Sequence, residues 1–190
     1  MHLKKRKTST NLNFFNEFHR HARLPKGISA SFLALIPKTS NPQGLGEYRP
    51  ISLIGCLYKM LSKVLAGRFK KVLKCVISSV QSAFLTGRNI LDGVVVVNEV
   101  MDMAKRQRKK CVILKADFEK AYDSVSWSYL DYMLDRLGFG VKWRGWMRTC
   151  FSSNSISILV NGSPTEEFVA QKGLKQGDPL APFLFLVAAE

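Results

Sequence analysis

The chain has 190 residues, of which 46% are hydrophobic and 23% are charged, with 13 glycines and 7 prolines. This composition suffices for a sizeable core and excludes a globally disordered or collagen-like chain. Lysine and arginine total 29 against 14 aspartates and glutamates, a net charge of +15. The excess lies in residues 1–110, which carry 21 basic and 5 acidic side chains, whereas residues 111–190 are nearly neutral. A basic region of this kind favours nucleic acid as partner over an anionic membrane surface or a merely solvated face.

The cysteines and the apolar runs exclude several other classes of protein. Cys56, Cys75, Cys111 and Cys150 are far apart and form no C-x-x-C pair, which argues against zinc and disulfides and favours reduced, intracellular thiols. The basic start of the chain is followed by polar residues, so it is not a signal peptide. No stretch of eighteen apolar residues predicts a membrane span, and we expect no membrane partner.

Residues 1–28 form a basic N-terminal segment. Phe14, Phe15 and Phe18 predict at most one amphipathic turn there, and Pro25 and Gly27 break any helix. Residues 31–36 have the pattern of a short buried strand that Pro37 closes, and residues 41–46 form a loop.

Residues 57–76 have the spacing of an amphipathic helix. The apolar positions are Leu57, Met60, Leu61, Val64, Leu65, Phe69, Val72, Leu73 and Val76. Four lysines on the other side, separated by four, seven and four residues, form one stripe: Lys59, Lys63, Lys70 and Lys74. Such a stripe either contacts phosphates or is a solvated face.

The next segments alternate between helix and strand. Residues 91–105 predict a helix with a basic end at 105–110, and residues 111–117 predict a central strand. Ser126 is a suitable N-cap for a helix that Gly138 ends, and residues 141–151 predict another helix. Strands at 155–160 and 166–170 flank an Asn161-Gly162 turn, which predicts a hairpin.

The last predicted helix opens at Asp178 and Pro179 and runs to Glu190 without a glycine or a basic final turn. The expected helix therefore has no recognisable end, and we interpret the sequence as stopping within it. We expect the apolar side chains of this helix to leave hydrophobic surface exposed. The order of strands and helices predicts an α+β fold. Asp117, at the end of an apolar strand, is a suitable oxygen ligand for Mg²⁺, although it also fits a turn cap.

Residues 117–125, from Asp117 to Val125, resemble the first catalytic motif of reverse transcriptases from LINE-type (non-LTR) retrotransposons, especially the plant group. The segments 36–38 and 48–53 resemble the fingers motifs of that family, and segments 81–88, 161–162 and 173–185 resemble later motifs in the same order. The resemblance covers roughly residues 20–190. It implies a right-hand polymerase fold, with fingers-like residues 29–110 and a partial palm at 111–190.

The resemblance also implies roles for single residues. Asp117 matches the first metal-binding aspartate, which two Mg²⁺ ions share, and Phe118 would add its backbone carbonyl. Tyr122 matches the aromatic gate that excludes a 2′-hydroxyl. Nucleotide contacts are implied for Lys38, Arg49, Gln176 and Gly177, whereas we interpret Asp123 and Asp178 as local caps. The implied partners are an RNA template, a DNA primer and deoxynucleoside triphosphates, and the implied location is the nucleus.

The chain departs from the family pattern at the second metal-binding motif. The second metal-binding pair of the family, an aromatic-Ala-Asp-Asp sequence, has no match, and no Asp-Asp dipeptide occurs in the chain. We therefore expect this polypeptide to be inactive alone. The alternatives are a non-catalytic module that binds RNA or an RNA–DNA hybrid through residues 1–110, and a decayed copy whose product does not fold stably.

Overall fold

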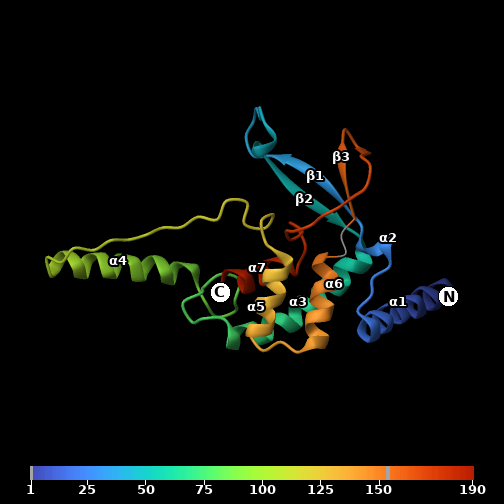
Figure 1. Cartoon of the computed structure of the whole chain (residues 1–190), viewed down its shortest axis with the longest axis horizontal. Coiled ribbons are helices and arrows are strands. Elements are labelled where there is room, and N and C mark those ends of the chain that lie inside the picture. Colours follow the sequence, from blue (N-terminus) through green and yellow to red (C-terminus); the bar gives the residue numbers. More distant parts are fainter. Residues whose placement is uncertain (1, 153–154) are drawn as a thin grey trace.

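The computed structural model describes residues 2–152 and 155–190, with side chains from residue 12 onward. Figure 1 shows a small sheet above a layer of helices, with one helix, α4, that projects from this body. The helices are α1 (His2–His21), α2 (Lys26–Ser29), α3 (Cys56–Val76), α4 (Ile90–Arg106), α5 (Trp127–Arg136), α6 (Val141–Ser152) and α7 (Ala181–Ala189). The strands are β1 (Ser31–Pro37), β2 (Tyr48–Ile54), β3 (Ser155–Val160), β4 (Ser163–Pro164) and β5 (Phe168–Val169). This mixed architecture agrees with the predicted α+β class.

The sheet has the order β2-β1-β3-β4, and β5 also pairs with β3. Strand β1 confirms the prediction for 31–36 and pairs antiparallel with β2 and parallel with β3. Sequence reasoning did not foresee β2, which contains Pro50. Proline is tolerated here because β2 is an edge strand and the Ser52 N–H, two residues on, points away from β1 toward the Gln176 carbonyl.

The hairpin after α6 forms around the predicted turn. Asn161 and Gly162 have φ values of 51° and 81°, the left-handed pair that a two-residue hairpin turn requires. Val160 pairs with Ser163 directly across the turn. The return strand differs from the predicted 166–170, since it is divided into β4 and β5.

Helix α3 lies at the centre of the helical layer, and its bounds confirm the prediction. The buried face of α3 differs from the predicted one. Met60, Val64 and Val72 are exposed although they belong to the predicted apolar face, whereas Tyr58 and Ser62 are buried. The core that α3 shares with α5, α6 and α7 contains Phe69, Leu73, Leu130, Leu134, Met147, Leu184 and Val187.

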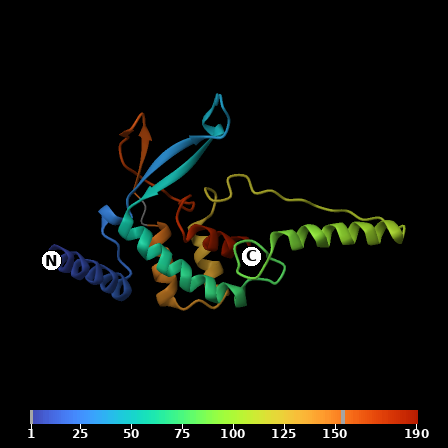
Figure 2. The same cartoon turned by 180° about the vertical axis from the view of Figure 1, so that it is seen from behind.

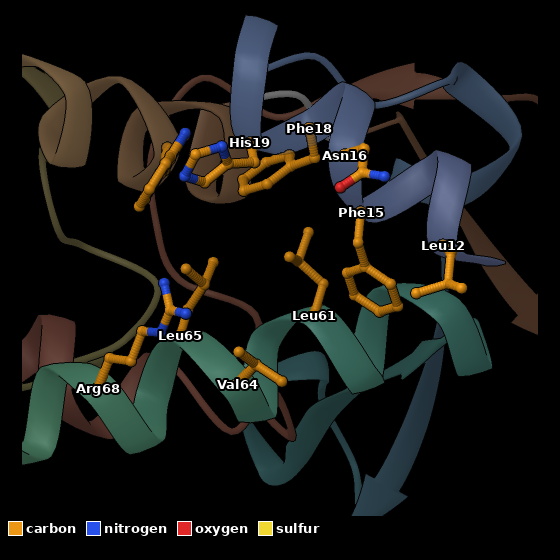
Figure 3. A pocket seen from close by; sticks show the side chains of 10 residues that line it. Leu12, Phe15, Asn16, Phe18, His19, Leu61, Val64, Leu65 and Arg68 are labelled. Atoms are coloured by element: carbon orange, nitrogen blue, oxygen red, sulfur yellow. The ribbon is translucent and has the colours of Figure 1, made fainter.

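Helix α1 corrects the expectation of at most one turn. It runs for 20 residues, and its aromatic side chains pack against the core through Phe18, which is buried beside the Trp146 ring at a centroid distance of 6.2 Å. These tertiary contacts stabilise a helix that its polar sequence does not favour by itself. A hydrophobic groove of about 360 Å³ remains between α1 and α3, with Phe15 and Leu61 on its two walls (Figure 3).

Helix α4 confirms the helix predicted at 91–105, but it has no buried residue. Seen from both sides, it projects from the body and is followed by a long extended segment (Figures 1 and 2). That segment contains 111–117, the predicted central strand, and no strand forms there. A strand needs a neighbour to pair its backbone groups, and none of the described residues pairs with this segment.

Helix α7 corrects two expectations. It begins at Ala181, with Leu180 rather than Asp178 at the N-cap. It is also largely buried, through Ala181, Leu184, Leu186 and Val187, so the exposed apolar surface lies on α4 and on 112–118 instead. In the described part of the chain, no helix combines the length and apolar character needed to cross a membrane.

Candidate active site

Asp117 lies in the extended segment after α4, and it is exposed. Around it, none of the described residues forms a group of three His, Cys, Asp or Glu side chains that would hold a metal. Mg²⁺ in phosphate-transfer sites is held by one or two carboxylates together with water and substrate phosphates. Asp117, with the Phe118 carbonyl beside it, therefore fits Mg²⁺ only as part of a larger ligand set and does not form a resident metal site.

The residues after Asp117 are attached to α7 by their rings. Phe118 meets Phe185 edge to face at 6.0 Å, and Tyr122 stacks on the same ring at 5.3 Å. Tyr122 is half-buried, and this burial raises the pKa of its hydroxyl, which stays protonated at neutral pH. The stacking gives Tyr122 a packing role.

The 173–178 loop joins this segment to the sheet. Its Leu174 N–H donates to the Tyr122 carbonyl at 2.8 Å, and its Gly173 N–H donates to the Val125 carbonyl at 2.8 Å. On the other side, the Ser52 N–H of β2 donates to the Gln176 carbonyl at 2.8 Å. The loop thus brings the turn after Asp117 and strand β2 to one place.

Gln176 and Gly177 lie where the loop meets β2. Gly177 has a φ of 102°, and a Cβ there would lie 3.3 Å from the Ser52 carbonyl oxygen, so a glycine suits both the conformation and the close approach. The Gln176 side chain lies 3.4 Å from Asp123 Oδ1 and donates to it. Asp123 is therefore a partner of Gln176 rather than the local cap that we expected.

A cavity of about 210 Å³ opens at this junction. Its walls are the inner side of the sheet, at Leu33, Pro50 and Ser52, and the loop at Gln176, with Asp123 beside it. Polar groups of the loop and of Asp123 converge here on an apolar surface.

Lys38 and Arg49 belong to the β1–β2 hairpin. Ile36 pairs with Arg49 in the register, and both basic side chains are exposed. Lys38 donates through Nζ to the Gly46 carbonyl at 2.8 Å, so its ammonium closes the turn between the strands. No hydrogen bond or ion pair within the described chain connects Lys38 or Arg49 to Asp117.

The predicted lysine stripe is exposed along α3, at Lys59, Lys63, Lys70 and Lys74. None of the ion pairs formed by the described residues includes these four ammonium groups. Their exposure agrees with contact to phosphates and equally with solvation, so their role stays a prediction.

Asp178 is a buried hydrogen-bond acceptor, only 7% exposed; its carboxylate caps the Leu180 N–H locally, although the N-cap residue of α7 is Leu180. Its carboxylate accepts from the Tyr58 hydroxyl, from the Ser62 hydroxyl and from the Leu180 N–H. Sequence reasoning missed Tyr58, Ser62 and the buried Lys175. The available signal was two polar residues, Tyr58 and Ser62, four apart beside the apolar face of α3.

Known proteins resemble most of this chain. Residues 36–190 match the family described as reverse transcriptase (RNA-dependent DNA polymerase). A transposon TX1 protein of 149 kDa from Xenopus laevis, itself described as uncharacterized, is 32% identical over 174 residues, which are 92% of this chain and 13% of that protein. The Pol polyprotein of a type-1 retrotransposable element R2 from Popillia japonica is 28% identical over 91% of this chain and 24% of its own length.

A third relative is the Pol polyprotein of the type-2 retrotransposable element R2DM from Drosophila melanogaster. It is 30% identical over 162 residues, 85% of this chain and 15% of that protein. The chain thus spans less than a quarter of the length of each of these three relatives.

Proposed function

This chain belongs to the reverse transcriptase family, and we propose that it supplies the fingers, at residues 29–110, and part of the palm, at 111–190, of an RNA-directed DNA polymerase. The polymerase would extend a DNA primer on an RNA template during retrotransposition. The observation that carries this proposal is the family match over 36–190, within which the 173–178 loop joins β2 to the turn after Asp117.

We assign the incoming deoxynucleoside triphosphate to the junction of the hairpin and this loop. Arg49 has an exposed, planar guanidinium that suits phosphate oxygens, and Lys38 adds a point charge. Gln176 and Gly177 would lie against the nucleotide, and the ring of Tyr122, held by Phe185, would exclude a 2′-hydroxyl.

Asp117 and the Phe118 carbonyl would contribute ligands to Mg²⁺ in the polymerase. When bound, two such ions stabilise charge on the attacking 3′-oxygen and on the leaving pyrophosphate. The chain contributes a single aspartate at this point, and one carboxylate neither balances two divalent ions nor fixes their separation. We therefore propose that the 190 residues do not polymerise alone.

Nucleotide binding and primer extension test this function in two steps. We expect the purified chain to bind a deoxynucleoside triphosphate with Mg²⁺, and Arg49→Ala to weaken that binding about tenfold or more, because it removes a charged phosphate contact. Arg136→Ala, at the exposed end of α5, is the matched control. Equal binding by both variants would contradict the nucleotide site. Template-dependent extension by the chain alone would contradict its proposed inactivity.

The second candidate is a non-catalytic module that binds nucleic acid. The exposed lysine stripe on α3 favours it. In that case RNA affinity falls steeply with salt, and changing the four lysines to alanine lowers the slope by about 3 to 4. Asp117→Asn separates the candidates, because it alters Mg²⁺ binding only in the polymerase.

We also propose a plant-group element as the source and the nucleus as the location. The plant-group source rests on the sequence from Asp117 to Val125. A comparison of whole-domain sequences that groups this chain with animal elements would contradict it. The nuclear location rests on the expectation that such elements prime on chromosomal DNA, and imaging of the tagged chain tests it.

A further inference from the structure

Four polar side chains are buried together where the 173–178 loop meets α3, and we call them the Asp178 cluster. Its members are Tyr58, Ser62, Lys175 and Asp178, and each is less than 9% exposed. Burial of polar and charged groups is costly unless they are hydrogen-bonded. The cluster therefore depends on its internal hydrogen bonds, and none of its members belongs to the proposed catalytic machinery.

Both carboxylate oxygens of Asp178 accept hydrogen bonds. Oδ2 accepts from the Tyr58 hydroxyl at 2.7 Å, while Oδ1 accepts from the Ser62 hydroxyl and from the Leu180 N–H at 2.9 Å. The Tyr58 oxygen also lies 3.0 Å from the Cys150 carbonyl, but the closer, charged carboxylate is the stronger acceptor for its single proton. Burial and the neighbouring Asp178 raise the pKa of Tyr58, which keeps this proton in place.

Lys175 fastens the other end of the same loop. Its Nζ donates to the Ser29 carbonyl, just before β1, at 2.8 Å, and lies 4.4 Å from the centre of the Tyr58 ring. At this distance the ring face attracts the ammonium group. Tyr58 therefore contacts both ends of the loop, Asp178 through its hydroxyl and Lys175 through its ring.

Between these two fixed ends lie only Gln176 and Gly177. The single backbone hydrogen bond from Ser52 to the Gln176 carbonyl connects them to β2. A side chain at position 177 would crowd the strand, since its Cβ would lie 3.3 Å from the Ser52 carbonyl oxygen, so glycine allows the loop to lie close to β2. Anchors on both flanks leave a two-residue segment few alternative positions.

We propose that the Asp178 cluster positions Gln176 and Gly177 against β2, so that its members are positioning residues for the nucleotide, which they do not touch. The consequence for the nucleotide rests on the proposed function, whereas the fixing of the loop does not. A buried polar cluster serves this purpose better than apolar side chains, because its hydrogen bonds are satisfied in one arrangement only.

Amide hydrogen exchange separates loop positioning from general stability. The reporter is the Ser52 amide, which donates to the loop, and the reference is the amide of the fully buried Leu130, which donates to the Ser126 carbonyl at the start of α5. We expect Tyr58→Phe to speed exchange at Ser52 about tenfold or more relative to Leu130, since a hydrogen bond to a charged group is lost. Ser62→Ala is the second, milder variant should Tyr58→Phe fold poorly. Tyr132→Phe, at an exposed position of α5, is the matched control and leaves the ratio unchanged.

Two results would overturn the proposal. Equal acceleration of amide exchange at Ser52 and Leu130 would mean that the cluster affects only global stability, and no acceleration at Ser52 would mean that it does not hold the loop. Equilibrium dialysis of dTTP with Mg²⁺ supplies the second readout, in which we expect Tyr58→Phe to weaken binding about threefold or more. Loss of affinity in Arg49→Ala but not in Tyr58→Phe overturns the positioning role and leaves the proposed function intact. Absence of dTTP binding by the unaltered chain contradicts the proposed nucleotide site, while the exchange ratio still decides whether the cluster holds the loop.

Discussion

Two regions of this molecule carry the candidate active site, and they differ in how they are supported. The 173–178 loop is bonded to β2, to the Tyr122–Val125 turn and, through Asp178, to α3. Asp117, in contrast, follows α4 and an extended segment in which Val112 and Leu114 are almost fully exposed. The supported loop is largely polar, with Leu174 as its one large apolar side chain, whereas the extended segment is apolar at 111–114, so hydrophobicity alone does not predict which region is packed.

The difference shows that an apolar pattern needs a partner before it becomes structure. Helix α4 begins with a good cap, since the Asn89 side chain accepts from the Leu91 N–H at 3.1 Å, yet its valines remain exposed. An isolated helix of this length is marginal in water, and valine is not among the strong helix formers. The nucleotide side of the site is therefore expected to be stable, and the Asp117 side to depend on a partner surface.

The largest test exchanges for alanine one leucine of the helical core on which the loop rests and one leucine of the extended segment. Leu134 in α5 is fully buried, whereas Leu114 is 91% exposed. We expect Leu134→Ala to lower the free energy of unfolding by about 2–5 kcal/mol, because it leaves a cavity. Leu114→Ala should change it by about 0.5 kcal/mol or less. Urea unfolding measures both, and similar losses would show that the two regions are equally packed.

The next test concerns the backbone of the well-supported loop. Gly173 has a φ of 91°, and a Cβ there would lie 3.0 Å from the Asp123 carbonyl oxygen. Gly173→Ala should therefore destabilise the chain by about 3 kcal/mol, from the left-handed conformation and the backbone clash together. The control is Gly87→Ala, with a similar φ of 82° but open space, for which about 1 kcal/mol is expected. Equal effects would mean that the loop moves freely away from Asp123.

A smaller effect is expected from the titration of Lys175. Burial lowers its pKa from the ordinary 10.5 to about 8, so above pH 8 the unfolded chain binds more protons than the folded one. Lys175 should consequently add about 1–2 kcal/mol of stability between pH 8 and 10, while burial raises the pKa of the Cys150 thiol and so acts in the opposite direction from about pH 9. Above pH 10 the raised pKa of Tyr58 acts in the opposite direction, because the unfolded state then loses the tyrosine proton first.

Lys175→Met removes this titration and serves as the reference in urea unfolding at each pH. The other titrating groups are common to both proteins, so the difference between the two curves reports Lys175. A constant difference from pH 7 to pH 10 would contradict the buried, perturbed lysine.

The smallest test compares the ion pairs of Arg144, with Asp131 and with Asp135, with the pair on α4. Arg144 donates to Asp131 at 2.9 Å with both side chains under 20% exposed, whereas Lys105 and Asp102 on α4 are 3.9 Å apart and well exposed. Arg144→Met should cost about 1 kcal/mol at pH 7, and Lys105→Met at most a few tenths. The hydrogen bond from Arg144 lowers the pKa of Asp131, so the cost of Arg144→Met should shrink as the pH falls below 4. Thermal unfolding at pH 7 and pH 3 checks both statements.

Local patterns were sufficient for several elements. The caps and spacing around Ser126 and Gly138 predicted α5, and the Asn161-Gly162 pair predicted the hairpin turn. These signals depend on a few neighbouring residues, so no tertiary information was needed. The same holds for α3 and α6.

Distant partners account for the errors. The burial of Tyr58 and Ser62 follows from Asp178, more than a hundred residues away, which no helical period reveals. The strand expected at 111–117 has suitable residues but no neighbour among the described strands. Strand β2 was missed because Pro50 argues against a strand except at an edge, and edge position is a property of the whole sheet. The site roles of Lys38, Arg49, Asp117 and Tyr122 stay predictions.

The Pro50 edge also limits how copies of this chain can associate. Pro50 has no backbone N–H, and the outward-pointing N–H of Ser52 already donates to the Gln176 carbonyl. A strand of another molecule therefore finds few free hydrogen-bond donors along β2. The unpaired backbone around Val112–Leu114 has no such protection. Intermolecular β-pairing during concentration or storage should therefore start there, and a charged substitution such as Leu114→Lys is the direct way to suppress it.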